Sequence, residues 1–234
     1  KVSAGGKAAV IKEMASMTVR VMFAASERDK ENTEAACGLA KQTVDIFLQQ
    51  EGVLGNVAKV LVASRTLYDH SINVCLMSMV LGRRLGIDQS RVRSLGMGAL
   101  LHDVGMAQIS PEILNKPDEF SEEERAEMQR HPRLGHQLLS LAKNMPYDAL
   151  NVVLNHHERI DGKGYPTGLS GQNIPSLARL VRVVDVYDAM TSPRPYREAM
   201  PPNQAAVTLL NEAGENLDRE MAVEFIKMHS EAFR

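Results

Sequence analysis

Apolar residues recur at helical spacing along most of the chain. Two stripes with spacings of three, four and seven are clear: Leu67, Val74, Met77 and Leu81, and Leu150, Val153 and Leu154. Strand-like runs of alternating apolar and polar residues are scarce. Ser110 before Pro111, and Ser121 with Glu124, are typical helix starts. We expect an all-α domain with helices near 56–85, 89–104, 121–142, 147–157, 175–190, 202–213 and 217–229.

Residues 1–55 follow a different pattern. An apolar stripe over 10–21 gives way to a fully polar run over 26–33, and a second helix is expected over 34–50. We therefore divide the chain into a helical lead-in, 1–55, and a main domain, 56–234. The lead-in is expected to pack on the main domain. The alternative is a signalling helix or dimer contact that follows an upstream regulatory region.

Composition narrows the class of protein. The 234 residues are 44% hydrophobic, which is enough for a substantial core and excludes a disordered tail. Because 29 acidic groups nearly balance 27 basic ones, a long nucleic acid is not expected as the partner. No apolar run approaches the roughly 20 residues of a membrane span. Two distant cysteines, Cys37 and Cys75, give no disulfide framework, so a cytoplasmic protein is expected. Because the chain opens on Lys1 without a signal-peptide pattern, we expect a piece of a longer protein.

Several histidines lie on the apolar helical stripes. His70 continues the first stripe, and an adjacent pair, His156 and His157, follows the second. His102 ends an apolar helix with Asp103 beside it. For a single histidine, a hydrogen bond within the core is the better interpretation. Together, however, these pairs favour a metal site.

Two carboxylates are expected to be buried with these histidines. Asp103 follows His102, and Asp185 lies inside an apolar helix. A buried carboxylate needs a cation, because leaving it unpaired costs several kcal/mol. Arg179 and Arg182 are close to Asp185 in sequence, but we expect them to point elsewhere on the helix. A metal held by the imidazoles would compensate both carboxylates.

The donor types indicate which ions and which chemistry to expect. Nitrogen and oxygen ligands without thiolate favour Fe, Mn, Zn, Co or Ni over Ca or Mg. Two metals that share a carboxylate would activate a water for attack on phosphorus. Lys163, Arg194 and Arg197 could then hold the phosphate. Lys163 belongs to a glycine-rich stretch, 159–173, that is too irregular for a helix, and loops of this length are usually functional.

These residues form motifs that resemble a known family. The motifs are Leu101-His102-Asp103-Val-Gly105, His156-His157-Glu158-Arg-Ile-Asp161-Gly162-Lys163-Gly164-Tyr165-Pro166, and Asp185-Val-Tyr-Asp188-Ala-Met-Thr-Ser-Pro-Arg194-Pro-Tyr-Arg197. They closely resemble the HD-GYP family, a branch of the HD phosphohydrolase superfamily. The resemblance begins near residue 65 and runs to the C-terminus. It implies an HD-type helical bundle with a long GYP loop, 161–166.

The resemblance also implies a function. HD-GYP proteins are bacterial signalling phosphodiesterases that hydrolyse cyclic di-GMP, the second messenger, with iron or manganese favoured as metal. The match implies one metal at His70, His102, Asp103 and Asp185, and a second at His131, His156 and His157. Asp103 would bridge the two metals, and Tyr165, Arg194 and Arg197 would contact the dinucleotide. The family further implies an upstream sensor or receiver module, and a diguanylate cyclase that contacts the GYP loop.

Two positions depart from the family pattern. Met106 stands where the family commonly has the lysine of its HDxGK motif, which removes a charge that faces the phosphate. Thr66 stands where three-metal members have a glutamate, so two metals are expected, and linear pGpG as the main product. Two alternatives to cyclic di-GMP hydrolysis stay open. One is a catalytically weak receptor or interaction module for cyclic dinucleotides, and the other is hydrolysis of a different cyclic dinucleotide, including cyclic GMP–AMP.

Overall fold

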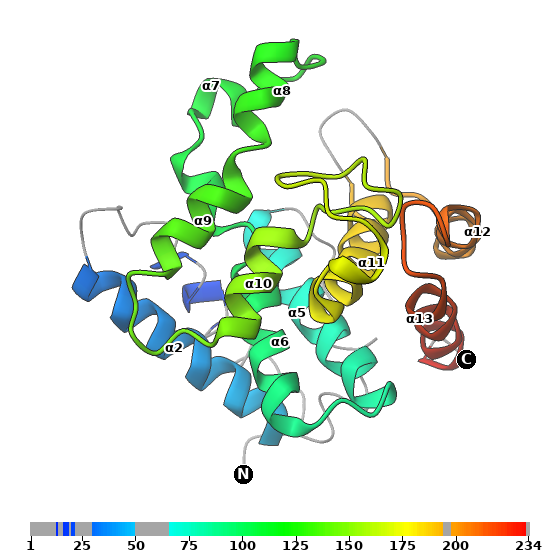
Figure 1. The fold of residues 1–234 in the computed structure, drawn as a ribbon, viewed down its shortest axis with the longest axis horizontal. Helices are drawn as coiled ribbons and strands as arrows, with labels where there is room; N and C mark the ends of the chain where they lie inside the picture. Colours follow the sequence, from blue (N-terminus) through cyan, green and yellow to red (C-terminus); the bar gives the residue numbers. More distant parts are fainter. Residues whose placement is uncertain are drawn as a thin grey trace.

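The computed structural model describes residues 13, 16–18, 20–21, 30–49, 66–193 and 198–232. These residues form helices without a strand, as expected (Figure 1). The α-helices are α2 (Lys30–Gln49), α5 (Leu67–Arg84), α6 (Gln89–Leu101), α7 (Pro111–Leu114), α8 (Glu122–Met128), α9 (His131–Leu139), α10 (Tyr147–Asn155), α11 (Ser176–Thr191), α12 (Pro202–Glu212) and α13 (Arg219–Ala232). Two short 3-10 helices are η1 (Val104–Gln108) and η2 (Gly171–Asn173).

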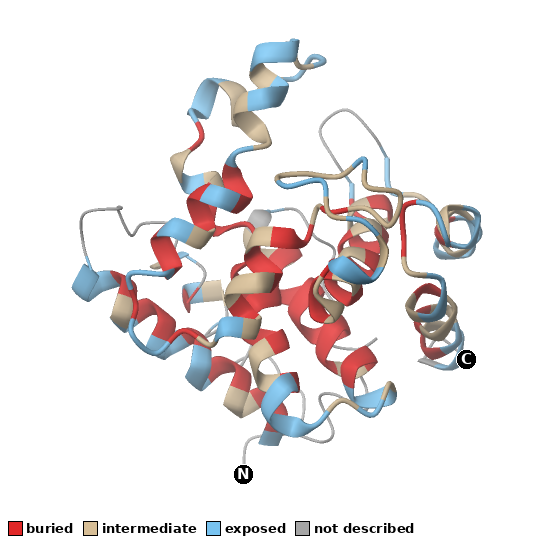
Figure 2. Ribbon diagram, in the orientation of Figure 1, coloured by how far each residue is buried: buried red, intermediate tan, exposed pale blue. Residues whose placement is uncertain are grey.

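The core lies where α5, α6, α10 and α11 meet, and Figure 2 shows buried residues concentrated in these four helices. Two glycines let the neighbouring helices approach α6 closely. A Cβ on Gly96 would lie 2.8 Å from the sulfur of Met79, and one on Gly98 would lie 2.7 Å from Cβ of Val152. The small residues of α6 therefore set its distance from α5 and α10.

Polar residues mark the helix starts as the sequence indicates. Thr66 caps α5 by accepting the Asp69 N–H, and Ser110 caps α7. The capping box of Ser121 and Glu124 at α8 is present in both directions. These bonds satisfy amides that would otherwise have no partner in the first turns.

The single helix expected over 121–142 is wrong, because two helices, α8 and α9, cover this stretch. Pro132 explains the break. It has no N–H to give the carbonyl of Met128, four residues earlier, and its ring would clash with that carbonyl. The carbonyl instead accepts a 2.8 Å hydrogen bond from Nδ1 of His131. The break therefore creates the group that orients a candidate metal ligand.

Helix α2 packs on α6, with Ala36, Ala40, Val44 and Phe47 fully buried. This part of the predicted lead-in lies in the core of the domain. The boundary predicted at residue 55 falls outside the described residues and stays a prediction. No helix in the described part of the chain combines the length and the apolar character needed to cross a membrane.

Candidate metal centre

The structure gathers the seven predicted metal ligands, which come from five helical segments, into two adjoining groups. His70 lies on α5, His102 and Asp103 follow α6, His131 begins α9, His156 and His157 follow α10, and Asp185 lies on α11. One group is Asp103, His131, His156 and His157, and the other is His70, His102 and Asp185. Within each group the ligand atoms lie within 4.8 Å of one another, so each group could hold a metal ion.

Asp103 lies between the two groups, and each carboxylate oxygen faces one of them. Oδ1 is 3.3 Å from Nε2 of His131 and 3.6 Å from Nε2 of His156. Oδ2 is 3.3 Å from Nε2 of His102 and 3.9 Å from Nε2 of His70. One side chain thus presents an anionic oxygen to both candidate metal positions.

The orientation of the histidines fits a cation. Nδ1 of His102, His131 and His156 lies 2.8, 2.8 and 2.9 Å from the backbone oxygens of Ala99, Met128 and Val153. Because a carbonyl only accepts, Nδ1 carries the proton, and in the neutral ring Nε2 is left with a lone pair.

Two of these lone pairs then face each other, since Nε2 of His131 and Nε2 of His156 are 3.3 Å apart. Nε2 of His102 and Oδ1 of Asp103 are buried and make no hydrogen bond. Acceptors that converge in this way repel one another unless a cation lies between them. The residues therefore fit a divalent metal at each group.

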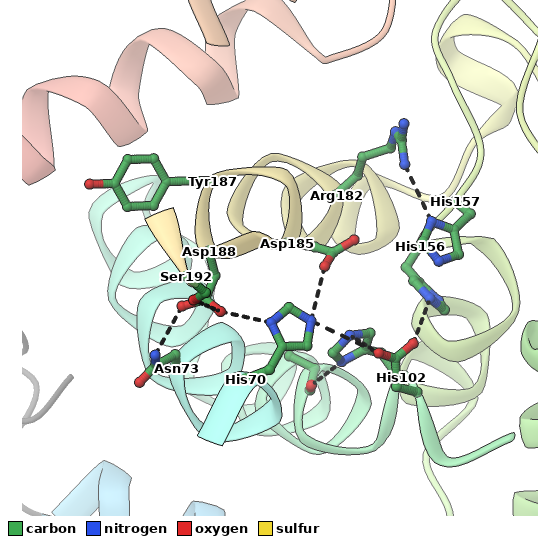
Figure 3. Close-up of polar contacts among 12 residues, drawn as sticks. His70, Asn73, His102, His156, His157, Arg182, Asp185, Tyr187, Asp188 and Ser192 are labelled. Atoms are coloured by element: carbon green, nitrogen blue, oxygen red, sulfur yellow. Dashed lines mark hydrogen bonds and ion pairs between the residues drawn. The ribbon is translucent and has the colours of Figure 1, made fainter. Parts of the chain in front are cut away.

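His70 is oriented by a carboxylate instead of a carbonyl. Its Nδ1 lies 2.7 Å from Oδ2 of Asp188, while its Nε2 lies 3.1 Å from Oδ1 of Asp185 (Figure 3). Asp188 is held in turn by the amide of Asn73 at 2.9 Å and the hydroxyl of Ser192 at 3.2 Å. This chain of bonds fixes the ring so that Nε2 points into the cluster.

The electrostatics of the cluster favour ionised carboxylates. Burial opposes ionisation of Asp103, but imidazoles that carry a proton toward it, His102 first among them, hold the pKa of this carboxyl well below its usual range, and a metal cation in their place would act in the same direction. Burial likewise opposes ionisation of Asp185, and His70 outweighs it, so the pKa falls. Burial and the neighbouring His156 lower the pKa of His157, which keeps this ring neutral and able to bind a metal.

Gly105 allows η1 to pack against α9 next to the cluster. A Cβ at this position would lie 2.0 Å from the backbone oxygen of His131 and 2.5 Å from the nitrogen of Gly135. Both neighbours are backbone atoms, so the clash has no simple relief. The glycine thus sets the distance between Asp103 and His131.

The irregular stretch 159–173, which contains the GYP loop, folds around a buried carboxylate. Glu158 accepts hydrogen bonds from the backbone N–H groups of Thr167, Gly168 and Leu169, at 2.7 to 3.2 Å. The loop also returns to its own start, since the N–H of Tyr165 donates to the backbone oxygen of His157 at 3.3 Å. The predicted long loop is therefore present and fastened to the residues that follow α10.

Tyr165 lies at the cluster, and Lys163 does not contact it. The Tyr165 ring stacks on His157 with centroids 4.7 Å apart, and burial raises the pKa of its hydroxyl. The Lys163 side chain is 80% exposed, and its ammonium is 3.9 Å from Asp161. Asp161 itself is held by both arms of the Arg159 guanidinium, at 3.0 and 2.7 Å.

Four further positions singled out in the sequence are two arginines expected to contact the substrate and two departures from the family pattern. Arg194 and Arg197 lie outside the described residues. Met106 lies in η1, half-buried, without a charge to offer. Thr66 is engaged as the cap of α5, where its hydroxyl donates to Oδ2 of Asp69 at 2.9 Å.

Three residues beside the cluster were not among the sequence-predicted ligands or contacts: Asp188, Glu158 and Arg182. Asp188 follows Asp185 by three residues on the same helix, which is the available signal. Arg182 corrects an expectation, because it does not point away from the site. Its Nη1 lies 3.4 Å from Nδ1 of His157 (Figure 3). Arg179 does lie elsewhere, paired with Asp218.

Comparison with known families identifies the fold. A family model described as HD domain matches residues 47–221. The chain belongs to the HD domain family. A solved HDG"Y"P protein from Bdellovibrio bacteriovorus, Bd1817, has the same fold, with a TM-score of 0.77 and 24% identity over 96% of this chain and 72% of that one. The HD-GYP resemblance and the helical fold expected from the sequence are confirmed.

Curated relatives share this domain. The cyclic di-GMP phosphodiesterase response regulator RpfG of Xanthomonas campestris is 44% identical over 61% of this chain and 39% of its own length. The 3'3'-cGAMP-specific phosphodiesterase 3 of Vibrio cholerae is 36% identical over 58% of this chain and 29% of its own length. The chain thus spans well under half the length of these relatives.

Proposed function

We propose that this HD domain is a metal-dependent phosphodiesterase that hydrolyses cyclic di-GMP to linear pGpG. The observation that carries the proposal is the Asp103 carboxylate, which directs one oxygen to each of two histidine groups. The relatives named as cyclic dinucleotide phosphodiesterases support the substrate class. We propose Asp103 as the residue that bridges two metals and holds the attacking water.

Two divalent ions at these groups, Fe or Mn favoured by the imidazole and carboxylate donors, would supply Lewis acidity for attack on phosphorus. The chain's own residues supply position. Asp188 holds the His70 ring, and three backbone oxygens hold the other buried rings. Tyr165 remains protonated at neutral pH and can donate to a phosphate oxygen. Arg194 and Arg197 are proposed dinucleotide contacts from the sequence resemblance alone.

In this proposal, a site with two metals yields the linear dinucleotide as its main product. Thr66, at the position of a third-metal ligand, already caps α5. Position 66 itself supplies no carboxylate for a third metal, and the neighbouring carboxylate of Asp69 is bonded to the Thr66 hydroxyl, so complete breakdown to GMP is not expected. An upstream sensor or receiver module, and contact of the GYP loop with a diguanylate cyclase, remain proposals from the resemblance.

The test is a time course with protein loaded anaerobically with iron or manganese. Cyclic di-GMP and 3'3'-cGAMP are supplied singly and in competition, and products are separated by chromatography. We expect loss of cyclic di-GMP and accumulation of pGpG. Preferential loss of 3'3'-cGAMP would overturn the assigned base preference, and GMP as the main product would overturn the two-metal account.

A receptor that binds but barely cleaves is the second candidate, and Met106 favours it. One missing charge at the phosphate could cost about 2–4 kcal/mol of transition-state stabilisation. A Met106→Lys variant distinguishes the two candidates. A large gain in rate at unchanged metal content supports the receptor, whereas an unchanged rate shows that methionine is tolerated and supports the enzyme.

A further inference from the structure

Arg182 contacts the candidate metal centre at His157. It lies on α11, one turn before Asp185, and its Nη1 is 3.4 Å from Nδ1 of His157 (Figure 3). His157 belongs to one of the two ligand groups, and the Tyr165 ring stacks on it. The guanidinium and the Tyr165 ring thus both contact the same ligand histidine.

The guanidinium is held in this position. Asn216 accepts hydrogen bonds at its side-chain oxygen from Nε of Arg182 at 3.0 Å and from Nη2 at 2.6 Å. The Asn216 amide donates in turn to Glu212. Two of the three guanidinium nitrogens are therefore bonded on the side away from the cluster, and Nη1 is left to face it.

This placement is unfavourable for a site that binds metal alone. An arginine stays protonated, so Nη1 donates and Nδ1 of His157 accepts. In the other described ligand histidines, Nδ1 faces an oxygen of Ala99, Met128, Val153 or Asp188. Here, instead, a fixed positive charge stands next to a group that is to hold a cation, and the two repel each other. An anion that contacts both removes this conflict.

We propose that Arg182 is a phosphate-binding residue of this site, and that Asn216 positions its guanidinium. The ligand class is a phosphate monoester or diester, and the inference rests on the proposed function for its natural substrate. Arg182 supplies the side-chain cation at the cluster that Met106 does not supply. When an anion binds, a phosphate oxygen replaces Nδ1 of His157 as the acceptor of Nη1, while Nε and Nη2 stay on Asn216.

The experiment measures phosphate affinity and metal content together. Metal-loaded wild-type protein, Arg182→Gln and Arg182→Lys are titrated with inorganic phosphate by calorimetry, and metals per chain are counted in the same samples. Arg91→Gln is the matched control. It removes the same charge from a surface pair with Asp148 that has no contact with the cluster.

We expect Arg182→Gln to weaken phosphate binding about 10- to 100-fold, as for loss of one charge-assisted hydrogen bond. Arg182→Lys should recover part of the affinity, and Arg91→Gln should match wild type. In steady-state assays with cyclic di-GMP, KM should rise by a similar factor in Arg182→Gln. Asn216→Ala should weaken phosphate binding less than Arg182→Gln does.

Two results would overturn the inference. Phosphate affinity of Arg182→Gln within twofold of wild type would show that the guanidinium does not contact the anion. Loss of a metal in Arg182→Gln would show that Arg182 acts by supporting His157. If wild-type protein leaves cyclic di-GMP intact while Arg182→Gln still weakens phosphate binding, the proposed function fails and this inference stands.

Discussion

Replacing Glu158 with glutamine tests how the irregular stretch 159–173, which contains the GYP loop, is held at the site. The two carboxylate oxygens accept four short contacts from three backbone amides, of Thr167, Gly168 and Leu169. Glutamine retains one acceptor oxygen. It places an NH2 donor where Oε2 now accepts from Gly168 at 3.1 Å and Leu169 at 3.0 Å. Donor then faces donor, and the loop must open there.

The cost follows from these contacts. Hydrogen bonds to a charged group contribute about 1.5–3 kcal/mol each, and Glu158→Gln loses the charge and two contacts, so we expect a loss of about 2–4 kcal/mol. For a domain of this size, 1 kcal/mol shifts Tm by about 2–4 °C, so a fall of about 5–15 °C is expected. The histidine cluster does not depend on Oε2, so both metals should remain bound.

Urea unfolding and amide hydrogen exchange measure the two parts of this prediction. The amides of residues 167–169 should exchange faster in Glu158→Gln than in wild type. Glu215→Gln, the same change at an exposed residue, is the control and should alter neither measurement. If the three amides of Glu158→Gln exchange at the wild-type rate and its free energy of unfolding is unchanged, the assigned role of Glu158 is refuted.

Three further changes test the site from other directions. Asp188→Asn removes the carboxylate that orients His70, and metal affinity measured by calorimetry should fall about 10- to 100-fold; unchanged affinity would show that the ring needs no such partner. Gly105→Ala forces a Cβ onto backbone of α9 and should lower the unfolding free energy by about 1–3 kcal/mol or more, whereas Gly38→Ala, with nothing within 4 Å, should not. If Gly105→Ala and Gly38→Ala had the same free energy of unfolding, the close packing of η1 against α9 would be contradicted. Asp103→Ala should lose both metals by elemental analysis, because both groups share this carboxylate; retention of one metal would remove its role as a bridge.

Much of the metal centre was predictable from the sequence because its ligands lie on apolar stripes. His70, His102, Asp185 and the pair His156 and His157 stand at positions that helical spacing directs inward. The structure brings all five together with Asp103, which the sequence also predicts as a buried carboxylate, and the resemblance adds His131. An inward polar residue is informative because burial without a partner is costly.

The residues that support the ligands were harder to predict, because their roles depend on distant contacts. Asn216 and Arg182 are 34 residues apart, and nothing in the helical period of α11 pairs them. The break between α8 and α9 was missed as well, although Pro132 marks it. The strong capping box at Ser121 indicated where the helix begins and gave no signal of where it ends.

The most direct test of the central claim counts metals and follows turnover in one sample. Wild-type protein is loaded anaerobically with iron or manganese, its metal content is determined per chain, and cyclic di-GMP is then added and analysed by chromatography. The account predicts two metals per chain, with conversion to pGpG. Two metals per chain with cyclic di-GMP bound but intact after long incubation would contradict it.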